Sequence, residues 1–188
     1  MDSVYVLDQK YRKELTEISN PAKRDSIAKT LSISANQLSG YFEGFQRHID
    51  TLNLIFIEKV IRQYGYPGKS LVGEPSNEAA WNIIQHSPQI ATYLPIVKKA
   101  ADSNELPFRF YALMLDRQLL QQGKEQIYGT QIQGQKMKNG KFEMFVWPIQ
   151  DPETVNERRK KAGFDLTVEE NAKRLNTTYR VVKMEEIK

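Results

Sequence analysis

The densest run of hydrogen-bonding side chains lies at residues 126–131, Gln-Ile-Tyr-Gly-Thr-Gln. Two amides, a phenol and a hydroxyl surround a glycine, which lets the backbone turn or approach a ligand closely. The amides recognise hydrogen-bonding partners but rarely catalyse reactions. We therefore expect a ligand-binding role for the four polar residues of this segment, which are Gln126, Tyr128, Thr130 and Gln131.

Acid–base chemistry would fall to other residues. His86 could act as general acid or base, Asp116 could orient it, and Arg117 or Arg12 could bind an anionic group of a substrate. Simpler explanations remain open. His86 follows Ile83 at helical spacing, which predicts an inward-facing ring, and a lone inward histidine is usually a satisfied core group. Asp116 and Arg117 could be a solvated charge pair, or they could be buried and have a structural or functional role.

Two further polar groups lie within predicted helices. Asp8 and Arg12 are four residues apart, beside Gln9, which is the spacing of a surface ion pair. Asp50 and Asn53 are three residues apart and could cap the helix, face solvent or line a pocket. We include all five as candidate ligand-binding residues.

The composition limits the chemistry that the chain can perform. The sequence has no cysteine, which excludes disulfides, thiolate nucleophiles and Cys-ligated metals. Its two histidines have no short ligand spacing, so we expect no metal and no cofactor. A metal held by His86 with Asp50 or Asp116 is a weaker alternative.

Charge and hydropathy limit the partners. The net charge is +4, but Lys and Arg are interspersed with Asp and Glu, so we expect no nucleic-acid binding. No apolar run approaches the roughly 20 residues that span a bilayer. We expect a soluble chain that binds a small polar ligand, a peptide or a protein partner. Residues 1–5 already resemble the inside of a helix, so the chain is expected to be cytoplasmic or the mature part of an exported or lipid-anchored protein.

The apolar spacing indicates the elements that must position these residues. Leu7, Tyr11, Leu15 and Ile18 form one helical face, and residues 44–64 form a longer helix with a wide apolar surface. Pro107 is expected to open another helix. We predict an α+β fold, predominantly α-helical, with a bundle-like helical array and one C-terminal β-hairpin. It would be a single domain over residues 1–188, with helices at about 2–122, the hairpin at about 126–149 and further helices at about 152–176.

The sequence Asn139-Gly140 predicts a two-residue hairpin turn. That turn would place Gln133 opposite Val146, with Ile132, Phe145 and Trp147 on one face that packs on helices. The other face would turn Gln131, Gln133 and Gln135 toward solvent or a cleft. Thr167 begins a capping-box pattern for a short helix, and residues 177–188 would either add a strand or fray.

Several short motifs occur in one order along the chain. They are Asp8-Gln9-x-x-Arg12, Asp50-x-x-Asn53, Tyr64-Gly65-Tyr66-Pro67, Gln85-His86, Leu115-Asp116-Arg117, Tyr128-Gly129-Thr130-Gln131, and Asp151-Pro152 with Arg158-Arg159 and Gly163. Together they resemble an uncharacterised bacterial family, domain of unknown function 6624, from about Asp8 to Gly163. Members often carry tryptophan at the position of Tyr66 and an acid at that of Ser87. The resemblance implies no activity, but it favours convergence of the motif residues in one site.

Three functions fit these observations. The first is a binding module whose polar pocket near the hairpin root holds a small polar ligand or peptide. The second is a metal-independent enzyme, hydrolase- or transferase-like, that uses His86 as acid or base. The third is a structural or protein-interaction domain in which the motif residues tie helices to the hairpin.

Overall fold

The computed structural model describes residues 1–187, and Lys188, the last residue of the predicted domain, lies outside them. The chain divides into two compact units, Met1–Gln89 and Ile90–Lys188. The prediction that the whole chain forms one domain stays a prediction. The predominantly helical α+β class is confirmed, because nine α-helices and one two-stranded hairpin occur within residues 1–187.

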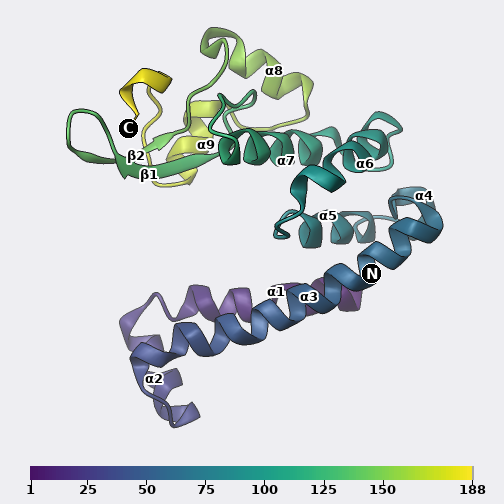
Figure 1. Cartoon of the computed structure of the whole chain (residues 1–188), viewed down its shortest axis with the longest axis vertical. Coiled ribbons are helices and arrows are strands. Elements are labelled where there is room, and N and C mark those ends of the chain that lie inside the picture. The colour runs from purple at the N-terminus through teal and green to yellow at the C-terminus, as the bar shows by residue number, and fades with distance from the viewer. Residues whose placement is uncertain (188) are drawn as a thin grey trace. The chain divides into compact units, whose positions relative to one another are not determined.

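The first unit is built on a long antiparallel helix pair (Figure 1). Its helices are α1 (Asp2–Glu17), α2 (Pro21–Leu31), α3 (Leu38–Tyr64), α4 (Lys69–Val72) and α5 (Ala79–Ile84). Buried Ile18 packs near Leu38 and Phe42, where α1 ends and α3 begins, and α5 packs on both helices. Helix α3 starts earlier than residue 44, because burial of Leu38 and Phe42 extends its apolar face past two glycines.

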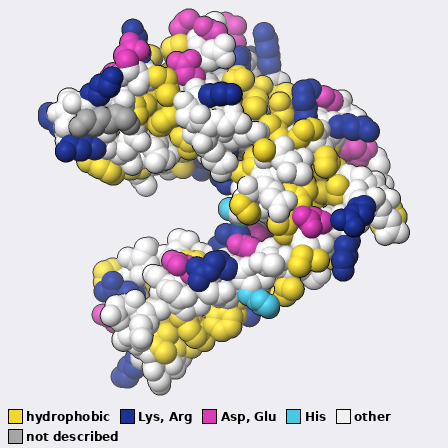
Figure 2. Space-filling model, in the orientation of Figure 1, with side chains coloured by type: hydrophobic (Ala, Val, Ile, Leu, Met, Phe, Trp, Pro, Cys, Tyr) yellow, Lys and Arg dark blue, Asp and Glu magenta, His cyan; other side chains and the backbone are white. Residues whose placement is uncertain are grey.

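Helix α3 also carries large apolar side chains that remain exposed (Figure 2). They are Tyr41, Phe45, Leu52, Ile55, Phe56 and Tyr64. The width of the predicted apolar surface is therefore real, but only part of it is buried. The buried side of the helix carries the polar residues Gln46 and Asn53 as well as Ile57.

The second unit combines helices with the hairpin. Its elements are α6 (Ile90–Asp102), α7 (Phe108–Gln121), β1 (Ile132–Lys136), β2 (Phe142–Val146), α8 (Val155–Lys161) and α9 (Val168–Arg174). Helices α6 and α7 pack together, and α7 begins directly after Pro107, as predicted. The predicted capping box of α9 is confirmed, because the Thr167 hydroxyl accepts from the Glu170 amide and the Glu170 carboxylate accepts from the Thr167 amide.

The hairpin register differs by one residue from the prediction. Ile132 pairs with Val146 and Gln133 with Phe145. The Met137 amide donates to the Lys141 carbonyl, so the loop contains three residues, and only Gly140 among them has a positive φ. A two-residue turn of the predicted type needs positive φ at both central positions. Asn139 does not adopt a positive φ, so the loop has three residues and the strand pairing shifts by one position.

The shifted register separates residues that were expected to share a face. Val146 packs with Ile149, Val155 and Val168, and Ile132 lies against this group. Phe145 and Trp147 instead pack with Met137, which follows β1, and with Val182, which lies in the C-terminal segment. Both faces of the hairpin are therefore packed at its root, while Phe142 and Met144 stay exposed. This packing stabilises a pair of strands that would be marginal alone.

The glutamine face and the C-terminal segment also differ from the prediction. Gln131, Gln133 and Gln135 are half-buried, and the Gln133–Phe145 pairing places Gln133 on the face of the Phe145 group. Residues 177–187 form no named strand, yet Val182 is buried and the Lys138 amide donates to the Glu186 carbonyl. Apart from one antiparallel bridge between Met137 and Ile187, this segment covers the hairpin and neither adds a strand nor frays. No helix in the described part of the chain is long and apolar enough to cross a membrane.

Candidate functional site

Asp116 anchors the polar loop of residues 126–131. Its carboxylate accepts hydrogen bonds from the amides of Ile127 (2.8 Å), Tyr128 (3.1 Å) and Thr130 (3.0 Å), and from the Thr130 hydroxyl (2.9 Å). The side chain is fully buried on α7. Burial raises the pKa of Asp116, and the donors of the loop oppose that rise. These bonds occupy about all the acceptor sites of a carboxylate.

Gln126 fixes the same loop from its other end. Its side-chain nitrogen donates to the carbonyls of Trp147 (2.7 Å) and Gln131 (3.0 Å), and its side-chain oxygen accepts from the Gln131 amide (2.9 Å). Gln126 is fully buried, so its amide is satisfied by backbone groups alone. Asp116 and Gln126 together hold the loop in one conformation, with no reliance on a ligand.

Gly129 lets the loop pack closely. Its φ is +65°, and a Cβ atom there would lie 2.7 Å from Val168 and 2.8 Å from Ile149. Tyr128 is half-buried, with its ring tilted against Phe164, and burial raises the pKa of its hydroxyl. The Gln131 side chain donates to the Thr130 hydroxyl at 3.0 Å. The structure thus brings the four polar residues predicted on this loop together with Asp116.

Beside the loop lies a pocket of about 250 Å³, called the arginine pocket below. Thr130 reaches it from the loop, while Arg109 comes from α7, Arg159 from α8 and Arg174 from α9. The remaining lining residues are Leu113, Gly163, Phe164, Asp165, Leu166 and Asn171. The three arginines were not predicted as site residues. Arg159 and Gly163 belong to the motifs recognised in the sequence, and this membership was the signal that could have marked them as site residues.

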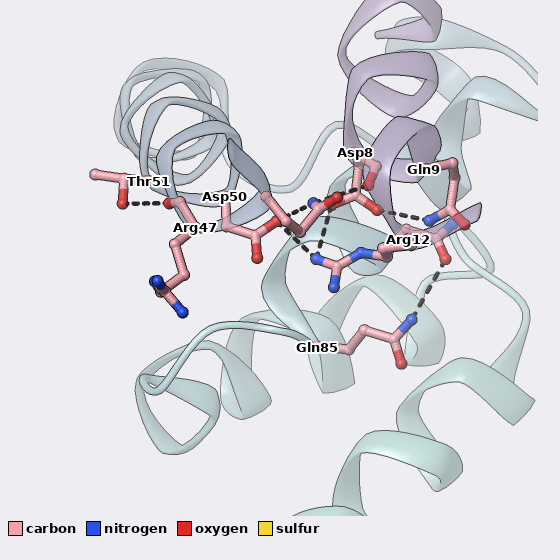
Figure 3. Close-up of polar contacts among 9 residues, drawn as sticks. Asp8, Gln9, Arg12, Arg47, Asp50, Thr51 and Gln85 are labelled. Carbon is pink, nitrogen blue, oxygen red and sulfur yellow. Dashed lines mark hydrogen bonds and ion pairs between the residues drawn. The ribbon is translucent and has the colours of Figure 1, made fainter. Parts of the chain in front are cut away.

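A second polar cluster lies between α1 and α3 in the first unit (Figure 3). Arg12 donates to Asp50 at 2.6 Å and to Asp8 at 3.4 Å. Gln9 donates to Asp8, and Gln46 donates to Asp50 and to the Asp8 carbonyl. Asp8 is 1% exposed, so the predicted surface pair is in fact a link between two helices. Gln46 was missed, although it precedes Asp50 by one helical turn.

Asp50 also lines a pocket of about 310 Å³ with His86. Glu58, Thr51 and Ser87 supply further polar groups to this pocket. The prediction that His86 faces inward was wrong. Helix α5 ends at Ile84, so the helical spacing does not continue to His86, which is exposed. The structure therefore places Asp50 and His86 in one pocket, which we call the histidine pocket.

The remaining predicted residues are distributed over both units. Asn53 is buried on α3, and Arg117 is half-buried on α7, where burial lowers its pKa. His86 belongs to the first unit and Asp116 to the second. Their predicted catalytic roles stay predictions. No three His, Asp or Glu side chains among the described residues gather closely enough to hold a metal ion.

Comparison with known proteins identifies a family for the chain. No curated protein matches the chain. No solved structure matches it either. A family model described as "Family of unknown function (DUF6624)" matches residues 11–184. This range contains the polar loop, the arginine pocket and the histidine pocket, with Asp8 and Gln9 just before it. Since the model covers most of the sequence, the chain belongs to this family of unknown function.

Proposed function

We propose that the protein is a ligand-binding domain and that the arginine pocket holds a small polar ligand or peptide at the root of the hairpin. The observation that carries this proposal is the fixed loop beside the pocket. Asp116 and Gln126 hold residues 126–131 through hydrogen bonds that need no ligand. Pre-formed surfaces bind with a smaller loss of conformational entropy than surfaces that order on binding.

The pocket has the composition of a small-molecule site. Apolar side chains, Leu113, Phe164 and Leu166, lie beside a few polar groups, which is the usual arrangement in ligand pockets. Its volume of about 250 Å³ is below the roughly 300 Å³ at which drug-sized sites begin. A small metabolite or one or two side chains of a peptide suit this space.

A pocket-filling variant tests this proposal in the full chain. Leu166 lines the pocket and is 37% exposed, so Leu166→Trp adds bulk there with little demand on the core. Val181 is an exposed apolar residue of the same unit outside the pocket, and Val181→Trp is the control. Metabolites, sugars, nucleotides and peptides would be screened by thermal shift. We expect a ligand whose stabilising effect is lost in Leu166→Trp and retained in Val181→Trp.

A second candidate is acid–base catalysis in the histidine pocket. It is supported by the presence of His86 and Asp50 in one cavity, where Arg12 and Gln46 hold the Asp50 carboxylate. His86→Ala would abolish turnover of a substrate found in the screen, whereas His48→Ala, on exposed surface of α3, would not. Turnover that survives His86→Ala would exclude this candidate. The protein partner that the sequence analysis also considered stays a prediction.

A further inference from the structure

We propose that the ligand of the arginine pocket carries an oxyanion, a carboxylate or a phosphate, and that Arg159, Arg109 and Arg174 bind it. This inference rests on the proposed function and names the chemical class of the ligand. The shared chemistry is a group with two or more anionic oxygens, which the planar guanidinium binds in a bidentate manner.

Arg159 carries the argument because its charge is buried without an ion-pair partner. Its side chain is 2% exposed, and its guanidinium donates to the carbonyls of Leu166 (2.8 Å) and Tyr128 (2.8 Å). Within residues 1–187 it forms no ion pair. Arginine remains protonated at neutral pH. The carboxylates of Asp116, Glu169 and Glu170 attract this charge without an ion pair, and its direct partners are neutral dipoles. A buried charge paired in this way is costly, and an anion in the adjoining pocket would compensate it further.

Phe164 holds the Arg159 side chain in place beside the pocket. The centre of the guanidinium lies 4.6 Å from the centroid of the Phe164 ring, and both residues line the cavity. The contact with the ring and the two hydrogen bonds to backbone carbonyls leave the guanidinium little rotational freedom. A donor group fixed in this way loses little entropy when it binds an anion.

The other charged groups of the pocket favour the same ligand. Arg109 and Arg174 add positive charge from two other helices, and Asp165 is the one acid among the lining residues. Arg174 donates to the Asn171 side chain, which is neutral and does not cancel its charge. The pocket therefore carries a net positive charge, on a protein whose acids and bases are otherwise mixed.

A purely structural role for Arg159 makes a different prediction. As a clamp between Leu166 and Tyr128, Arg159 would stabilise the fold without any requirement for Arg174 or Arg109. The test therefore uses Arg174→Gln, with Arg109→Gln as a second variant. Lys173→Gln is the matched control, because it removes the same charge from the adjacent, exposed position of α9 without touching the pocket.

The experiment is a chemical-shift titration of the ¹⁵N-labelled full chain in a chloride buffer at constant ionic strength. Inorganic phosphate and acetate are added in separate arms. We expect saturable shifts of the amides of residues 163–171 with at least one anion, and the responding arm identifies a phosphorylated or a carboxylate ligand. Binding should weaken about tenfold in Arg174→Gln and in Arg109→Gln, and stay within about twofold of wild type in Lys173→Gln.

Two results would overturn the inference. One is the absence of saturable shifts with both anions, while a neutral ligand from the screen shifts the same amides; the proposed function would then stand and its anionic ligand would not. The other is equal weakening in Lys173→Gln and Arg174→Gln, which would indicate attraction by net charge alone. If no ligand of any charge shifted these amides, the proposed function itself would fail.

Discussion

At the scale of single residues, buried polar side chains connect segments that are distant in sequence. Asp116 and Gln126 bind the backbone of the loop at residues 126–131, and Arg12 joins α1 to α3 through Asp50. From sequence spacing alone, Asp116 and Arg12 could each belong to an ordinary surface charge pair. Their burial and their distant partners show instead that they organise the two candidate sites.

Asp116→Ala should destabilise the protein by about 3 kcal/mol, because it leaves several donors of the loop without acceptors. Urea unfolding would measure the loss. Asp102→Ala serves as control, since Asp102 makes an exposed ion pair with Lys98 and its removal should cost under about 0.5 kcal/mol. Equal losses in the two variants would contradict the anchoring role of Asp116.

Arg12→Met should lower the free energy of unfolding by about 2 kcal/mol, because the buried Asp8 carboxylate then loses its cation. Arg47 points away from this cluster in Figure 3 and pairs with exposed Glu43. Arg47→Met should therefore change the unfolding free energy by less than about 0.5 kcal/mol. A loss below 1 kcal/mol for Arg12→Met would argue against a structural link between the helices.

At the scale of elements, local rules predicted the start of α7 and the cap of α9, but neither the start of α3 nor distant partners. The start of α7 after Pro107 and the capping box at Thr167 follow from residues a few positions apart. The hairpin register depended on the backbone angle of Asn139, which residue preference does not determine. The arginine pocket combines residues from α7, α8 and α9, so no local pattern could have predicted it.

Gly129→Ala should destabilise the second unit by about 3 kcal/mol, because its methyl group would meet buried Val168 and Ile149 at a positive φ. At Gly134 the new methyl would meet Met144 and Phe142, which are exposed and can move. Gly134→Ala should therefore stay within about 1 kcal/mol of wild type. Thermal or urea unfolding of both variants would decide.

The C-terminal segment should detach from the hairpin in acid. The Lys183 amide and Arg180 hold the pKa of Glu186 below its ordinary value of 4.5, and Arg180 does the same for Glu143. Because these pKa values are lowered in the folded state, the stabilisation is present above pH 4.5 and is lost as the pH falls through the lowered values. The methyl resonances of Val182 would report the release.

Arg180→Gln provides the control for that titration. Arg180 donates to Glu143 at 3.0 Å and to Glu186 at 2.9 Å, so its removal should bring both carboxyl pKa values closer to the ordinary value. The acid-induced change of the Val182 resonances should then begin at higher pH than in wild type. An unchanged profile in Arg180→Gln would show that these ion pairs do not hold the segment.

At the scale of the whole molecule, the chain belongs to the family of unknown function (DUF6624) and consists of two compact units, each with its own polar cavity. The motif residues recognised in the sequence fall into both units. Asp8, Arg12 and Asp50 form one network, while Asp116 and Gln126 hold another. The proposed binding activity is assigned to the second unit because its loop is fixed without a ligand.

The most direct test of this assignment is the ligand screen on the full chain, repeated with Leu166→Trp and Val181→Trp. A ligand at 100 times its dissociation constant should stabilise the wild type by about 2.7 kcal/mol. The account predicts that this stabilisation is lost in Leu166→Trp and kept in Val181→Trp. A ligand that stabilises all three proteins equally would contradict it and would place binding outside the arginine pocket.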